Sequence, residues 1–170
     1  DFKKPAFETQ ATEIYPCITE INFFLKNLDE WSKPRWVPSG ALFFGTVSRI
    51  QMEAKGCVLI FGPWNYPFHL TIVPLIGAIA AGNTGILKPS ELTPHTALLI
   101  QELVKECCRE DHFNVVLGPV ETANDLLKLE FDHIFFTGSP QVGKIVMKAA
   151  AENLTSVTLE LGGKSSAIID

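Results

Sequence analysis

The chain has 170 residues, of which 46% are hydrophobic and 19% charged, and its formal net charge is −5. These values are typical of a globular protein with its own core, and the acidic balance argues against a nucleic-acid partner. The four cysteines and four histidines lack metal-ligand spacing. We therefore expect no metal site, and reduced, mostly buried thiols.

The first 40 residues are predicted to form a helical segment followed by a linker. Apolar residues recur at helical spacing over 6–31, and Pro16 is expected to kink or divide this helix. Two prolines and a glycine indicate that 32–40 is the linker.

A short β-rich segment follows, over residues 41–55. Its apolar and β-branched residues between 41 and 52 predict a strand pair, which is a candidate oligomerisation element.

From residue 56 to 170, short β-type runs alternate with helical patterns. This alternation predicts an α/β fold: a Rossmann-like parallel sheet with helices on both faces, as in a dinucleotide-binding domain, incomplete at its C-terminal end. Strands are expected at 57–61, 85–88, 114–117, 133–136 and 156–161, and helices near 69–81, 94–108, 120–129 and 140–152.

Residues 56–87 contain no Asp, Glu, Lys or Arg, a length that would suffice for a membrane span. Three prolines and several glycines interrupt the run, which a lipid-exposed backbone would not tolerate. We interpret it as a buried strand, a functional loop and a core helix. No signal peptide is recognisable at the start, and we expect the protein in the cytoplasm or at the periphery of an intracellular membrane.

Four polar or glycine-rich loops follow four of the predicted strands. Ligands of an open parallel sheet bind beyond the carboxyl ends of its strands, so these loops are expected to meet at one crevice. The loops are residues 62–68, 88–91, 137–143 and 160–164.

Two side chains in these loops suit catalysis. The Asn65 carboxamide can donate to a developing oxyanion, although a turn asparagine that bonds its own backbone is the alternative. Glu160 ends an apolar strand, where burial would raise its pKa and make it a general base. The alternative is an exposed glutamate at a strand end.

Other residues suit a nucleotide. Lys88 and Glu91 follow a strand at i, i+3 and either bond ribose hydroxyls or form a surface pair. Gly138 to Gly143 matches G-x-x-x-x-G before a helix, which can present backbone N–H groups to a phosphate. The run lacks the Lys-Ser/Thr of a P-loop, and an ordinary helix cap is the alternative.

Together these motifs resemble the aldehyde dehydrogenase superfamily, and most closely the class that contains fatty aldehyde dehydrogenases. The resemblance covers nearly the whole chain, with the motifs in the family's order and spacing. They are Pro63-Trp64-Asn65-Tyr66-Pro67-Phe68, Leu87-Lys88-Pro89-Ser90-Glu91, Phe136-Thr137-Gly138-Ser139 with Val142-Gly143, and Leu159-Glu160-Leu161-Gly162-Gly163-Lys164.

The resemblance implies NAD or NADP as cofactor, a small-molecule aldehyde as substrate, and a homodimer. Asn65 would be the side-chain donor of the oxyanion hole and Glu160 the general base. The residues implied to lie against the cofactor are Trp64, Lys88, Ser90, Glu91, Gly138, Ser139, Val142, Gly143, Leu161 and Gly162.

The implied reaction oxidises the aldehyde to a carboxylic acid through a cysteine thiohemiacetal and a thioester. The nucleophilic cysteine of the family lies some tens of residues beyond the Glu160 motif, so we expect it outside this chain. Any membrane association is likewise expected through segments outside it. The alternatives are a nucleotide-binding fragment or pseudoenzyme without catalysis, and a relative that uses the fold only for assembly.

Overall fold

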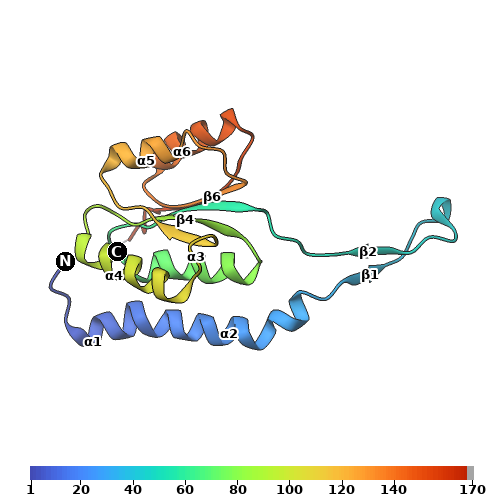
Figure 1. Ribbon diagram of the computed structural model, residues 1–170, viewed down its shortest axis with the longest axis horizontal. Helices are drawn as coiled ribbons and strands as arrows, with labels where there is room; N and C mark the ends of the chain where they lie inside the picture. The colour runs from blue at the N-terminus through green and yellow to red at the C-terminus, as the bar shows by residue number, and fades with distance from the viewer. Residues whose placement is uncertain (168–170) are drawn as a thin grey trace.

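The computed structural model describes residues 1–167, and its centre is a five-stranded sheet of order β5-β4-β3-β6-β7 (Figure 1). All neighbouring strands are parallel, so their carboxyl ends lie at the same edge. The predicted parallel α/β fold is therefore confirmed. The strands are β3 (Cys57–Phe61), β4 (Thr84–Lys88), β5 (Phe113–Val115), β6 (His133–Gly138) and β7 (Ser156–Leu161).

Helices cover both faces of the sheet, as the alternating pattern predicted. The helices α3 (His69–Ala80) and α4 (Pro94–Cys107) lie on one face, and α5 (Val120–Leu126) and α6 (Pro140–Glu152) on the other (Figure 1). After β5 the chain crosses to the other side of β3, so the strand order reverses between β3 and β6. Ligands of open α/β sheets bind at such a reversal.

The central strands are almost continuously apolar because both of their faces are buried. Leu59 of β3 and Leu87 of β4 are fully buried, in the separate cores on the two sides of the sheet. The uncharged run 56–87 becomes β3, a loop, α3 and most of β4, as expected for a core. Within residues 1–167, no helix is both long and apolar enough to span a bilayer.

The N-terminal helix packs along the α3 side of the domain and has three parts (Figure 1). They are α1 (Ala6–Thr9), a π-helical turn (Gln10–Ile14) and α2 (Tyr15–Trp31). Pro16 opens α2, and the wider turn lies directly before it. A proline lacks the N–H for an i−4 bond and clashes with the i−4 carbonyl, so the wider turn accommodates it without ending the helix.

The short antiparallel pair is present, but only one of its two strands lies within the predicted range 41–52. β1 (Arg35–Val37) falls inside the predicted linker and pairs with β2 (Ser48–Ile50). The apolar residues Ala41–Phe43, predicted as strand, form a 3₁₀ turn at the tip. The two prolines of 32–40 flank β1 rather than interrupt it, so its ladder is intact. The hairpin extends away from the domain (Figure 1).

Candidate functional site

A cavity of about 950 Å³ lies at the carboxyl ends of β3, β4, β6 and β7, and all four predicted loops line it. The strand register explains the convergence, because Phe61 at the end of β3 is level with Lys88 of β4 and Phe136 of β6. Thr137 is in turn level with Glu160 of β7. The predicted site residues that line the cavity are Trp64, Asn65, Lys88, Ser90, Glu91, Gly138, Ser139, Val142, Glu160, Leu161 and Gly162.

Gly143 is the predicted site residue that does not line the cavity. It lies within α6, where it is buried against β7. A Cβ atom at this position would lie 2.9 Å from Cδ2 of Leu161, so the glycine allows α6 to approach the strand closely.

Asn65 lies in the irregular loop between β3 and α3, and its exposed side chain faces the cavity. Its backbone carbonyl accepts a hydrogen bond from Lys4 Nζ at 3.0 Å. The turn-asparagine alternative required a hydrogen bond between the Asn65 carboxamide and a nearby backbone group. Within residues 1–167 the carboxamide makes no such bond. The side chain is therefore free to donate to a ligand.

Lys88 is not the surface residue that the alternative reading required, because it is only 3% exposed. Its ammonium donates to the Pro89 carbonyl at 2.9 Å and lies 3.4 Å from the Glu91 carboxylate, which is partly exposed. An ammonium has three N–H donors. Within residues 1–167 it has these two partners, so one N–H is left to donate to a ligand. A buried ammonium beside a cavity suits a polyhydroxyl or anionic group.

The N-terminus of α6 opens onto the cavity. Ser139 is its N-cap, and the Ser139 hydroxyl accepts a hydrogen bond from Val142 N at 3.3 Å. Both residues line the cavity. Residues 138–143 thus contain an ordinary helix cap, as the alternative interpretation expected. The capped end still carries the partial positive charge that attracts phosphate.

Glu160 lies near the end of β7, at the edge of the sheet, and its side chain is exposed. The described residues therefore do not provide the apolar surroundings that the sequence predicted for this carboxylate. The reason is topological, since β7 has β6 on one side and no strand of residues 1–167 on the other. Its place beside the cavity is as expected.

None of the four cysteines lines this cavity within the described part of the chain. Cys57 begins β3 and so lies at the amino end of this strand, whereas the cavity lies at the carboxyl end. Burial, followed by the nearby Glu13 carboxylate, raises the pKa of the Cys17 thiol to about 11. Burial is also the main cause that raises the pKa of Cys108. Thiols with raised pKa values are poor nucleophiles near neutral pH.

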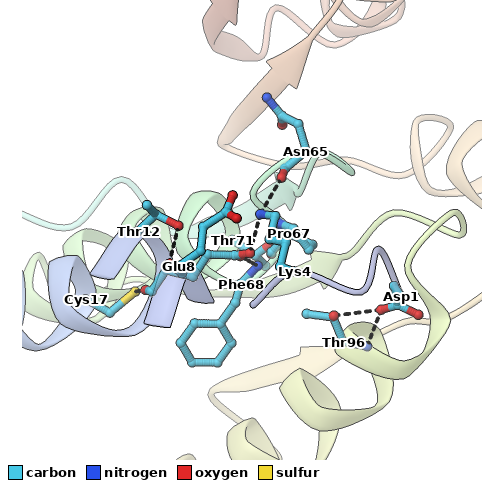
Figure 2. Close-up of polar contacts among 11 residues, drawn as sticks. Asp1, Lys4, Glu8, Thr12, Cys17, Asn65, Pro67, Phe68, Thr71 and Thr96 are labelled. Atoms are coloured by element: carbon cyan, nitrogen blue, oxygen red, sulfur yellow. Dashed lines mark hydrogen bonds and ion pairs between the residues drawn. The ribbon is translucent and has the colours of Figure 1, made fainter. Parts of the chain in front are cut away.

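Sequence reasoning missed two residues that support the site, Lys4 and Glu13. Both come from the N-terminal segment: Glu13 pairs with Lys4 and accepts from Phe68 N, and Lys4 contacts the loop that carries Asn65 (Figure 2). Glu13 resembles an ordinary solvent-facing helix residue, and its partner Phe68 is 55 residues away. No local pattern indicates such a contact.

A parallel sheet with a ligand-sized cavity at its strand reversal defines a Rossmann-like nucleotide-binding class. The family model for the aldehyde dehydrogenase family matches residues 1–170. The chain belongs to this family, which confirms the resemblance found from its motifs.

Relatives and solved structures agree with the family. The chain is 50% identical over its whole length to aldehyde dehydrogenase family 3 member A2 of Pongo abelii, covering 35% of it. It is 49% identical to 4,4'-diaponeurosporen-aldehyde dehydrogenase of Staphylococcus aureus, again over its whole length and 37% of the relative. The chain thus spans about a third of the length of these relatives.

Two solved structures are similar over nearly all of the chain. The substrate-bound state of Staphylococcus aureus AldH has a TM-score of 0.90 and 50% identity, over 93% of this chain and 34% of that one. The aldehyde dehydrogenase of Mycobacterium tuberculosis, in complex with NAD+, has a TM-score of 0.82 and 33% identity, over 95% of this chain and 33% of that one.

Proposed function

We propose that the protein oxidises an aldehyde to a carboxylic acid with NAD or NADP, and that this chain supplies the cofactor site, the oxyanion donor and the general base. The observation that carries the proposal is the single cavity lined by Asn65, Lys88, Ser139 and Glu160, each from a different loop. Family membership supports the same chemistry.

The cavity fits a dinucleotide. The buried Lys88 ammonium and the Glu91 carboxylate would bond the hydroxyls of one ribose, with Ser90 and Trp64 beside them. The N-terminus of α6, with Gly138, Ser139 and Val142, would hold the phosphates. Leu161 and Gly162 would lie against the nicotinamide. The bound cofactor supplies an acceptor for the hydride that leaves the substrate carbon.

Asn65 would act when a cysteine thiolate adds to the aldehyde and the carbonyl oxygen becomes an oxyanion. A carboxamide N–H with no competing bond can donate to that oxygen. Glu160 would then accept a proton from the water that hydrolyses the thioester. We propose that the thiolate belongs to a part of the protein beyond Asp170, since no cysteine of residues 1–167 lines the cavity.

Pairing of two copies through the hairpin is a second part of the proposal. Leu42 and Phe44 at its tip are 97% exposed, and Trp36 of β1 is 64% exposed. Apolar side chains in such a protruding position are typical of a surface that another chain covers. We further propose that the protein lies in the cytoplasm or at the periphery of an intracellular membrane. Any membrane association would occur through segments outside this chain.

The test of the proposed function is Asn65→Ala in the full-length protein. Loss of one oxyanion donor lowers kcat by about 10²–10³, while the Kd for the cofactor should change little. A normal kcat for aldehyde oxidation would refute the role of Asn65. Absence of aldehyde oxidation by the unmodified protein, with cofactor binding intact, would instead favour the non-catalytic nucleotide-binding alternative.

A further inference from the structure

The ammonium group of Lys4 has three neighbours that hold it in place. It donates to Glu13 Oε1 at 2.8 Å and to the backbone carbonyl of Asn65 at 3.0 Å. It also lies 4.3 Å from the centre of the Tyr66 ring, which is a cation–π distance. The Lys4 side chain is 18% exposed and that of Glu13 is 5% exposed, so water screens this pair little.

Glu13 connects the pair to the end of the same loop. Its second carboxylate oxygen accepts a hydrogen bond from Phe68 N at 2.9 Å. Phe68 is the N-cap residue of α3, and it provides no capping side chain of its own. The Glu13 carboxylate therefore caps α3 from a distant helix, where a negative charge is also favourable for the helix dipole.

The loop over residues 62–67 is anchored at its two ends: Gly62 N donates to the Lys88 carbonyl at 3.1 Å, and the Tyr66 and Pro67 carbonyls accept from Leu70 N at 3.0 Å and Thr71 Oγ1 at 2.7 Å. It forms no regular secondary structure, and Pro63 and Pro67 lack N–H groups. Within residues 1–167, the bond from Lys4 is the one hydrogen bond that Asn65 makes. Figure 2 shows the backbone carbonyl of Asn65 meeting Lys4 while its carboxamide points the other way. Holding the carbonyl thus holds the backbone from which the carboxamide projects.

We propose that the Lys4–Glu13 pair is a positioning element for the oxyanion site, which holds the Asn65 peptide so that its carboxamide faces the reacting carbonyl oxygen. This inference rests on the proposed role of Asn65. Neither Lys4 nor Glu13 lines the cavity, so they act through the loop and not on the substrate.

The test is a double-mutant cycle on kcat in the full-length protein, with Lys4→Met and Asn65→Ala. Lys4→Met keeps the aliphatic stem and removes the charge and the donors. We expect kcat to fall by about 10- to 100-fold, since a shift of about 1 Å in a catalytic group can cost 10²-fold. The cofactor Kd should stay within about twofold. In the Asn65→Ala background, Lys4→Met should lower kcat no further, because only interacting residues are non-additive.

Three further variants exclude a general structural effect. Lys4→Arg keeps a cationic donor and should restore much of the lost kcat. Glu13→Gln can still accept from Phe68 N but no longer pairs ionically with Lys4, and should cause a smaller loss in kcat. Lys33→Met removes an exposed pair with Glu30 at 2.7 Å and should leave kcat unchanged.

The outcomes separate this inference from the proposed function. A normal kcat in both Lys4→Met and Glu13→Gln, or a loss that adds fully to that of Asn65→Ala, overturns the positioning role while the role of Asn65 stands. A normal kcat in Asn65→Ala overturns the proposed function itself. If Lys4→Met does not fold, the same cycle is measured with Glu13→Gln.

Discussion

Replacement of Lys88 by methionine gives a quantitative test of the cofactor site. Methionine keeps the buried stem but removes the ammonium, which is held by Pro89 at 2.9 Å and Glu91 at 3.4 Å. The third N–H would be lost as a donor to a ribose hydroxyl. A hydrogen bond to a charged group contributes about 1.5–3 kcal/mol, which corresponds to an increase in Kd of about 10- to 150-fold.

The assay is titration of the full-length protein with NAD, followed by calorimetry below the unfolding temperature. Lys128→Met is the matched control, because Lys128 pairs with Asp125 at the same i, i+3 spacing but both side chains are more than 70% exposed. Its Kd should equal that of the unmodified protein. An unchanged Kd in Lys88→Met would show that the buried ammonium of Lys88 makes no contact with the cofactor.

Three other expectations follow from charge, packing and burial. Glu91→Gln should improve NADP binding relative to NAD by at least about fivefold, since it removes repulsion of a 2′-phosphate; equal ratios of Kd would contradict this. Gly85→Ala should lower the melting temperature, because its Cβ would lie within 3 Å of a backbone oxygen of β3, whereas Gly40→Ala, with open space around it, should not. Cys17, whose pKa is raised to about 11, should react with iodoacetamide far more slowly at about pH 8 than the exposed Cys107. Its reaction should accelerate as the pH rises toward 11. Peptide mass spectrometry measures both rates, and equal rates for the two cysteines would contradict this expectation.

The alternating pattern from residue 56 onward predicted the sheet and its helices, with ends that differ from the structure by at most three residues. Buried parallel strands are continuous apolar runs, so their signal is local and strong. The convergence of the loops followed from the same topology, because parallel strands end at one edge. Those parts of the fold and site follow from local sequence signals and from the parallel topology that they imply.

The remaining features depend on long-range contacts. The helical spacing predicted α2, but the stripe on which it was based includes Ile18 and Leu25, which are 50% and 72% exposed. The face that packs on the domain carries Glu13 and Cys17 instead. The first hairpin strand was misplaced for a similar reason, since pairing between Arg35 and Ile50 is not encoded in either segment by itself. Exposure of Glu160 depends on which chain segments cover β7.

We propose that this cavity oxidises an aldehyde with Glu160 as the base for hydrolysis, and rapid mixing of the Glu160→Gln variant tests that role. The variant keeps the shape of the side chain and removes the base. In the full-length protein with NAD and an aldehyde, it should release about one equivalent of NADH in a burst. Steady turnover should then be about 10²- to 10⁴-fold below that of the unmodified protein. Full steady turnover in Glu160→Gln, or loss of the burst together with turnover, would contradict the role of Glu160 as the hydrolysis base.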